Sequence, residues 1–213
     1  MYDKFEQLTK EKQNRILNAA FLEFATKGYK LASTDIIAKE AEISKGALFL
    51  YFKNKKNMFI YLFDYAVQKT TKEFFERVDF DEPDMLNRYK GAILVKLSVM
   101  KDNPSIFEFL TRVTLEDVEE LKPIIDERVK EIAQNGYSRL FTDIDYSLFK
   151  EGIDKQKAIN IILWTLEGYS NSLLNKYRKT KMLLSDFDHD QILKEIDEYL
   201  CVLKTCLYKK EAE

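Results

Sequence analysis

Residues that interrupt regular structure are scarce in this chain, which has six glycines and three prolines among 213 residues. Apolar residues instead recur at spacings of three and four over long stretches, the period of an amphipathic α-helix. All three prolines, Pro83, Pro104 and Pro123, stand where such a pattern begins, and a helix tolerates proline at its start. The sequence therefore predicts an all-α protein.

Cysteine and histidine are nearly absent, with two cysteines and one histidine in the chain. Cys201 and Cys206 are five residues apart in a helical pattern and point about 140° away from each other, so we expect no disulfide between them. Metal-ligand spacings are missing, and His189 lies between two aspartates at a predicted helix start without a nucleophile beside it. We expect no metal, no cofactor and no enzymatic activity.

Long apolar runs are also missing, because no stretch of eighteen apolar residues occurs. The first residues, MYDKFEQLTK, do not have the charged and then apolar order of a signal peptide. The sequence therefore predicts a cytoplasmic protein with no membrane partner.

Charge is unevenly distributed, although the total is near neutral with 34 basic and 36 acidic residues. Residues 1–58 hold eleven Lys or Arg and seven Asp or Glu, so the basic excess is confined to this end. A short basic head on an acidic body suits a protein that contacts phosphates with one end only. A solvated charged surface explains the same charges equally well.

Helix boundaries can be placed from caps and periodicity. A first apolar stripe, Ile16 to Phe24, ends at Gly28, a residue suited to the left-handed position after a helix. Further helices are predicted at 34–41, 45–52, 55–77, 83–101, 104–117, 122–144, 154–178 and 188–209, with Ser33, Ser44 and Asn54 as capping candidates. The two short helices at 34–41 and 45–52, joined by a tight turn, form a helix-turn-helix.

The head resembles the TetR family of bacterial transcription regulators. The resemblance rests on the stretch ILNAAFLEFATKGY and continues, at fixed spacing, through Thr34, Ile37, Ala38, Ala41, Ser44, Gly46, Leu48, Tyr51, Phe52, Lys55 and Met58. It covers about residues 12–60, while the remainder matches in length and helical character. It implies a three-helix DNA-binding head over 1–54, joined to a larger helical body over 55–213 that binds an effector and forms a homodimer.

The resemblance also implies which residues contact operator DNA. Gly46 removes a side chain where a helix must approach the major groove closely, and Lys45 is a donor for phosphate or guanine. Leu48 and Phe52 are expected to face inward, whereas Phe49 and Tyr51 are expected on the exposed side. The predicted DNA-binding set is Thr34, Ser44, Lys45, Gly46, Ala47, Phe49, Tyr51 and Lys55.

Two positions depart from the family pattern. Glu42 stands where the family usually has a turn glycine, and a left-handed conformation there costs about 1 to 2 kcal/mol. Phe49 stands where tyrosine is common, so one phosphate contact is replaced by a possible contact with a thymine methyl.

The body contains two apolar patterns that suit the family's four-helix dimer interface, or equally a core within one chain. They comprise Ile159, Ile162, Leu163, Leu166, Leu173, Leu174 and Tyr177, and then Ile192, Ile196, Tyr199, Leu200, Leu203 and Leu207. Aromatic residues in the body are candidates for lining an effector pocket, with ordinary packing as the alternative. These are Tyr89, Phe107, Phe109, Tyr137, Trp164 and Tyr169.

Taken together, these features predict a ligand-responsive regulator, a repressor released from a pseudo-palindromic operator by a small apolar or aromatic effector. The alternative is a helix-turn-helix protein that organises DNA, or is controlled by a protein partner, without a small-molecule effector. A well-formed cavity in the body favours the first interpretation.

Overall fold

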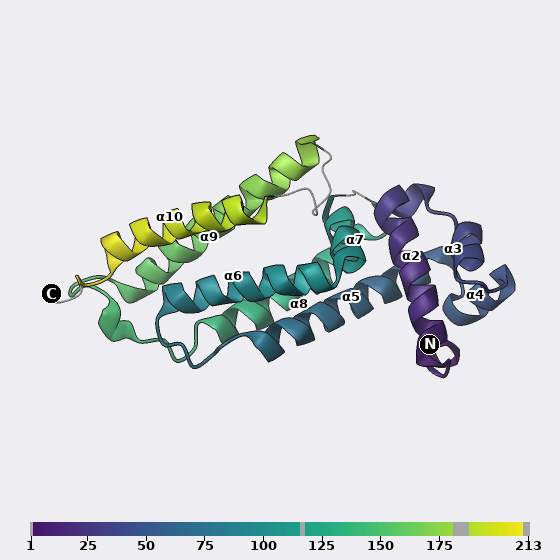
Figure 1. The fold of residues 1–213 in the computed structure, drawn as a ribbon, viewed down its shortest axis with the longest axis horizontal. Helices are drawn as coiled ribbons and strands as arrows, with labels where there is room; N and C mark the ends of the chain where they lie inside the picture. Colours follow the sequence, from purple (N-terminus) through teal and green to yellow (C-terminus); the bar gives the residue numbers. More distant parts are fainter. Residues whose placement is uncertain (1, 116–117, 181–187, 211–213) are drawn as a thin grey trace. The chain divides into compact units, whose positions relative to one another are not determined.

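In the computed structural model, the described residues are 2–115, 118–180 and 188–210, without the side chains of residues 131–139, 174, 177, 178 and 180. This part of the chain is helical and contains no strand (Figure 1). The helices are α1 (Asp3–Glu6), α2 (Lys10–Leu31), α3 (Thr34–Glu40), α4 (Lys45–Phe52), α5 (Lys55–Arg77), α6 (Met85–Asp102), α7 (Pro104–Leu115), α8 (Lys122–Leu140), the 3₁₀ turn η1 (Tyr146–Leu148), α9 (Lys155–Thr180) and α10 (His189–Leu207).

Local capping explains why the short helices of the head begin where they do. The Ser33 hydroxyl accepts a hydrogen bond from Ile36 N at 3.4 Å, and the Ser44 hydroxyl accepts one from Ala47 N at 3.1 Å. Each bond satisfies one of the amide groups that a helix start leaves without an intrahelical partner. The predicted helix starts at α3 and α4 are confirmed.

Glycine and asparagine define the next two boundaries. Gly28 has φ 69°, so the chain changes direction there inside α2, as the sequence predicts. The side chain of Asn54 accepts a hydrogen bond from Asn57 N at 2.8 Å and so caps α5. Both signals are local in sequence, which is why they could be read without a structure.

The chain folds as two compact units. Unit 1 comprises Met1–Phe75 and Val99–Lys130, and unit 2 comprises Glu76–Ser98 and Glu131–Glu213. The helix-turn-helix therefore shares unit 1 with α7 and with the first part of α8, and the boundaries between the units fall inside α5, α6 and α8. The predicted division at residues 54 and 55 concerns functional domains and stays a prediction.

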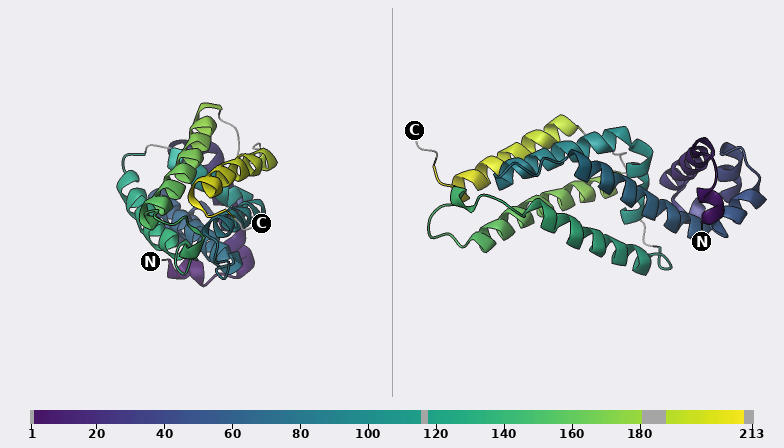
Figure 2. Two further views of the ribbon diagram at one scale, coloured as in Figure 1. Left: turned by 90° about the vertical axis from the view of Figure 1, so that its left-hand side faces the viewer. Right: turned by 90° about the horizontal axis from the view of Figure 1, so that it is seen from below.

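The core of unit 1 is rich in aromatic rings. Phe109 of α7 is 0% exposed, and its ring centroid lies 5.3 Å from that of Phe21 and 5.1 Å from that of Phe59. Because Phe21 belongs to α2 and Phe59 to α5, one cluster joins the head to α7. Figure 2 shows the ribbon of the chain in two further views. Close aromatic packing of this kind stabilises by large buried area and by edge-to-face contacts.

The core of unit 2 is mainly aliphatic, although the rings of Phe149 and Tyr208 are also buried in it. Buried residues of α9 and α10 such as Ile162, Leu166 and Leu200 pack together. Arg88 of α6 is also buried, and its guanidinium donates to the carbonyl oxygens of Glu82, Leu140, Thr142 and Asp143 at 2.6 to 3.3 Å. Arg88 thus binds a carbonyl group before the start of α6 and three carbonyl groups at and after the end of α8. These bonds matter because a buried charge without partners is costly.

Two short elements lie outside the predicted set. They are α1 and the turn η1, whose four and three residues are too few to show helical periodicity. Among the described residues, no helix is long and apolar enough to cross a membrane.

Candidate nucleic-acid interface

The recognition helix α4 has a buried face and an exposed face. Leu48 and Phe52 are each 1% exposed and pack into the core of unit 1, as the sequence predicts. Ser44, Lys45, Gly46 and Leu50 are exposed, while Ala47 and Phe49 are half-buried. The helix is therefore anchored by one side and presents the other to solvent.

Gly46 is not required by packing within the chain. A Cβ atom added there would meet only the Ser44 hydroxyl, at an ordinary 3.9 Å. The missing side chain instead leaves the first turn of α4 open on its outer face. Such an opening is useful where another molecule approaches the backbone closely.

The first turns of α3 and α4 lie side by side. The Lys45 ammonium forms an ion pair with the Asp35 carboxylate at 2.8 Å and lies 6.0 Å from the centre of the Phe49 ring. Thr34, half-buried, is the first residue of α3. The predicted contacts Thr34, Ser44 and Lys45 are therefore brought together at two helix N-termini, where free amide groups favour anions.

Lys55 lies at the start of α5 and belongs to a second cluster. Its ammonium donates to the carbonyl oxygen of Lys30 at 3.1 Å and lies 5.2 Å from the centre of the Tyr29 ring. This contact holds Lys55 against the end of α2. The lysine is half-buried, with its charge kept at the surface of the head.

Tyr51 does not lie on the exposed side, and that expectation was wrong. The residue is 8% exposed, and its ring lies 6.2 Å from that of Phe5 in α1. The short helix α1, which lies outside the predicted set of helices, covers this side of α4. Tyr51 therefore contributes chiefly to the core of the head.

The turn between α3 and α4 contains a feature that sequence reasoning missed. Glu42 has φ 52°, the left-handed conformation in which glycine is favoured. Arg15 of α2 donates from Nε to the Ala41 carbonyl at 2.9 Å and pairs with the Glu42 carboxylate at 3.0 Å. Arg15 thus holds the turn and balances the charge of Glu42. The left-handed position was anticipated, but its partner lies 27 residues away in the sequence.

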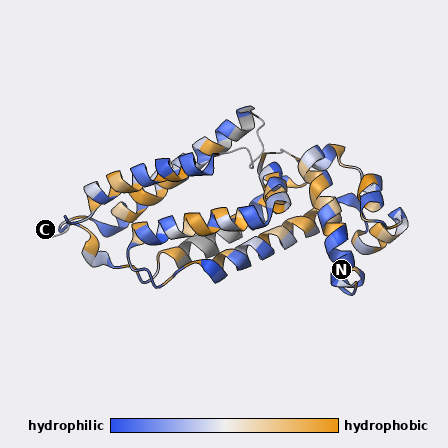
Figure 3. Cartoon of the chain, viewed as in Figure 1, coloured by the Kyte–Doolittle hydropathy of each residue, from blue (hydrophilic) through white to orange (hydrophobic). Residues whose placement is uncertain are grey.

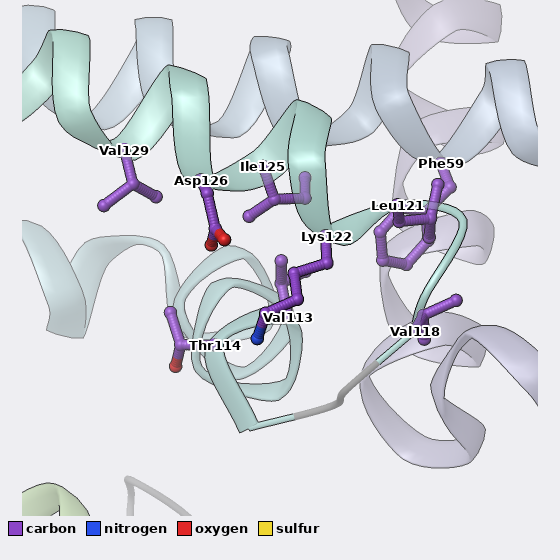
Figure 4. A pocket seen from close by; sticks show the side chains of 9 residues that line it. All are labelled: Phe59, Val113, Thr114, Val118, Leu121, Lys122, Ile125, Asp126 and Val129. Atoms are coloured by element: carbon purple, nitrogen blue, oxygen red, sulfur yellow. The ribbon is translucent and has the colours of Figure 1, made fainter.

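Unit 1 also contains a cavity of about 240 Å³ between α5, α7 and α8 (Figure 4). Its apolar walls are Phe59, Val113, Val118, Leu121, Ile125 and Val129. Three polar residues complete the lining: Thr114, Lys122 and Asp126.

Comparison with known proteins places this architecture in a family. A sequence model of the bacterial regulatory proteins of the tetR family matches residues 16–62, the segment that contains the helix-turn-helix. The head of the chain therefore matches the TetR family. Its fold is the TetR fold, a helix-turn-helix head followed by a helical body.

Two curated relatives of this chain come from Bacillus subtilis (strain 168). An uncharacterised HTH-type transcriptional regulator, YuxN, is 43% identical over 61 residues, which cover 29% of this chain and 21% of that protein. The match thus spans about a fifth of that relative's length. A fatty acid metabolism regulator protein is 28% identical over 160 residues, covering 73% of this chain and 80% of that protein.

A solved structure extends the likeness to the whole fold. NalD, the secondary repressor of the MexAB-OprM multidrug efflux pump in Pseudomonas aeruginosa, matches with a TM-score of 0.63 over 95% of this chain and 98% of its own. The identity is 21%, so this comparison shows a shared TetR fold only. The relatives named here are regulators.

The six predicted pocket residues do not lie together. Phe109 is enclosed by rings of the core of unit 1, and Trp164 is 67% exposed, so their role at an effector stays a prediction. Phe107, Tyr89 and Tyr169 are half-buried, with the Tyr169 hydroxyl donating to Glu195 at 2.9 Å. The side chain of Tyr137 lies outside the described residues. None of the other five lines the cavity of unit 1.

The two apolar patterns of α9 and α10 belong mostly to the core of unit 2. The buried members are Ile159, Ile162, Leu166, Ile196, Leu200, Leu203 and Leu207. Leu163, Leu173 and Ile192 are half-buried, Tyr199 is exposed, and the side chains of Leu174 and Tyr177 lie outside the described residues. Other apolar residues remain exposed on these helices, namely Ile161, Trp164 and Val202. Figure 3 shows the resulting alternation of apolar and polar residues along both helices.

Proposed function

We propose that this protein is a ligand-responsive DNA-binding regulator, a repressor that a small apolar or aromatic effector releases from operator DNA. The observation that carries the proposal is the exposed first turn of α4. It combines an open position at Gly46, a serine cap and a lysine beside the first turn of α3. The TetR head and the regulators among its relatives support the same function.

The DNA contacts of the proposal divide into two groups. Thr34, Ser44 and Lys45 contact phosphates from helix starts, with Lys55 doing so from α5. Gly46, Ala47 and Phe49 lie along α4, where a helix in the major groove meets base edges and thymine methyl groups. The ring of Tyr51 is excluded from the groove by its burial, so only its hydroxyl is left for a phosphate.

The ion pair between Lys45 and Asp35 does not prevent this role. Both side chains are more than half exposed, and exposed pairs contribute roughly 0 to 1 kcal/mol. A phosphate can therefore replace Asp35 at little cost. In the absence of DNA, Asp35 keeps the Lys45 ammonium near the starts of α3 and α4.

A homodimer follows from the exposed apolar residues of unit 2. Ile161 and Trp164 of α9, with Tyr199 and Val202 of α10, are large apolar residues left in solvent by one chain. Burying them against a second copy gives two recognition helices related by a two-fold axis. The operator is then pseudo-palindromic, with half-sites about 34 Å apart or further.

DNA binding is tested with the double variant Lys45→Ala, Lys55→Ala on an operator selected by the wild-type protein from random duplexes. We expect weaker binding and a salt dependence shallower by about two units of slope, because each lost phosphate contact removes about 0.9. The matched control is Lys101→Ala, Lys130→Ala, which removes two exposed lysines outside the head.

The two double variants have the same net charge, so a general charge effect is the same in both. Equal affinity of the Lys45, Lys55 variant and the control at two salt concentrations contradicts the assignment. Weakening confined to the Lys45, Lys55 variant supports it.

A further inference from the structure

The cavity of unit 1 has the lining of a site for a compact small molecule. Its volume of about 240 Å³ is below the roughly 300 to 1,000 Å³ of pockets for drug-sized ligands. Most of its wall is apolar, contributed by side chains of α5, α7 and α8 (Figure 4). The occupant it suits is therefore a compact, mainly apolar molecule.

The polar residues of the cavity restrict the charge of such a molecule. Lys122 and Asp126 are exposed residues one turn apart on α8, and Thr114 supplies a hydroxyl from α7. A charged ligand would meet one residue of its own sign, whereas a neutral ligand with a hydroxyl or amide finds both a donor and an acceptor. Val129, 44% exposed, stands beside them.

One wall of the cavity is a turn that also contacts the head. Val118 and Leu121 line the cavity, and their turn is closed by a hydrogen bond from Leu121 N to the Val118 carbonyl at 2.8 Å. Glu120, in the same turn, pairs with the Lys56 ammonium at 3.8 Å and accepts a hydrogen bond from the Tyr29 hydroxyl. We call these two contacts of Glu120 the Glu120 bridge.

The Glu120 bridge ends next to a predicted DNA contact. Lys56 is adjacent to Lys55 at the start of α5, and the Lys55 ammonium lies over the ring of Tyr29. Phe59, a wall residue of the cavity, lies 5.1 Å from the rings of both Phe24 and Tyr29. The cavity is thus separated from the end of α2 and the start of α5 by a single layer of side chains.

We infer that this cavity is the effector site, that it binds a small neutral molecule with an apolar body and one hydrogen-bonding group, and that the Glu120 bridge couples its occupancy to the head. The inference rests on the proposed function of a ligand-responsive regulator. An occupant displaces the turn of Val118 and Leu121, which draws Glu120 away from Lys56 and Tyr29. The start of α5, with Lys55, then moves relative to α4.

The coupling requires that the ligand prefer one state of the head. With the bridge closed, the turn limits the space between α7 and α8; with the bridge open, the ligand gains contacts along Val118 and Leu121. This difference in binding shifts the population toward the state with lower affinity for DNA. The effect on operator affinity is expected to be roughly tenfold, within the usual 5- to 150-fold range of such couplings.

The site is tested with phenol, a neutral ring with one hydroxyl, by NMR of methyl groups in the full-length protein. We expect phenol to shift the methyl resonances of Val113, Val118 and Ile125, while methyl groups of unit 2 such as Ile196 stay unchanged. Val129→Trp places a large ring beside the polar residues of the cavity and should abolish these shifts. Lys130→Trp, at the next exposed residue of α8, is the matched control and should keep them.

The coupling is tested with Glu120→Gln, with Glu119→Gln as the control. Both variants remove one exposed carboxylate from the same turn, but only Glu120 forms the bridge. We expect phenol to weaken operator binding roughly tenfold in the wild type and in Glu119→Gln. In Glu120→Gln, phenol should still shift the cavity methyl groups yet change operator affinity less than about twofold.

The outcomes separate this inference from the proposed function. A wild-type protein that selects no operator contradicts the proposed function, whatever phenol does. Operator binding together with unchanged cavity methyl groups at saturating phenol overturns the site and leaves DNA binding standing. Phenol binding that leaves wild-type operator affinity unchanged, or equal release from wild type and Glu120→Gln, overturns the coupling.

Discussion

The cores of the two units are built from different kinds of side chain. Unit 1 closes its core with aromatic rings, among them Phe21, Phe24, Phe59 and Phe109. Unit 2 uses aliphatic residues of α9 and α10 and leaves Trp164, its largest apolar side chain, in solvent. Both units leave large apolar residues exposed, among them Leu31 and Leu50 in unit 1 and Trp164 and Val202 in unit 2.

This difference indicates a division of roles. In unit 1, rings from α2, α5 and α7 touch one another, so a displacement at α7 or at the start of α8 reaches the helix-turn-helix through direct contacts. Close-packed interiors transmit such displacements because they contain few voids. In unit 2, the same helices provide an internal core on one face and the proposed dimer surface on another.

The largest expected effect comes from opening the aromatic core. Phe109→Ala should destabilise unit 1 by about 3 to 5 kcal/mol, through lost burial and the cavity left behind. Although Phe109 lies in α7, the amide groups of α3 and α4 should lose protection in hydrogen exchange, because the head shares this core. Ile162→Ala, at a buried residue of unit 2, is the control and should spare those amides. Unchanged protection of α3 and α4 in Phe109→Ala would show that the head is stable without α7.

The second effect concerns the exposed residues of unit 2. Trp164→Glu should weaken dimerisation by about 2 kcal/mol or more, roughly thirtyfold in Kd, because buried tryptophans are typical interface hot spots. Light scattering at micromolar concentration measures the shift toward monomer, and the folded state should persist because the side chain is exposed in one chain. Leu94→Glu, another exposed apolar residue of unit 2 but on α6, should leave the dimer intact. Equal dimer dissociation by both variants would place the interface elsewhere.

A smaller effect is expected at the turn of the helix-turn-helix. Glu42→Gly removes left-handed strain of about 1 to 2 kcal/mol. It also loses the exposed ion pair with Arg15, about 0.2 to 1 kcal/mol, and gains unfolded-chain entropy. The free energy of unfolding should therefore rise by about 1 kcal/mol or less. Lys53→Gly, at the other left-handed head residue with φ 65°, loses no ion pair and should gain more. Urea denaturation compares the two, and a larger gain from Glu42→Gly would mean that Arg15 does not stabilise the turn.

The smallest effect is a pH dependence at Tyr29. Burial, together with a hydrogen bond from its hydroxyl to Glu120, raises the pKa of Tyr29 from 10.0 to about 12. Since the folded pKa is the higher one, the stabilisation is complete below pH 10 and is lost as the pH rises through about 12. The difference in unfolding free energy between wild type and Tyr29→Phe should shrink over this window, with the other tyrosines common to both proteins. A constant difference from pH 9 to pH 12 would contradict the raised pKa.

Several features of the site could be predicted because their causes are local. The bounds of α4 and α5, Lys45–Phe52 and Lys55–Arg77, match the prediction, since capping residues and apolar spacing lie within the same segment. The inward positions of Leu48 and Phe52 follow from the same spacing. Tyr51 could not be placed in this way, because its cover is the four-residue helix α1, which has no periodicity to read.

The sequence by itself determined the all-helical architecture, the helix-turn-helix and the resemblance of the head to the TetR family, because helix periodicity, caps and a motif of fixed spacing are properties of neighbouring residues. Only the tertiary structure decided what each apolar face packs against. It assigned Phe109 to the aromatic core, placed Arg15 on the turn at Glu42, and brought Glu120 to Lys56 and Tyr29 beside a cavity. These contacts join segments far apart in the chain, and a periodic pattern shows that a face is buried without showing which partner buries it.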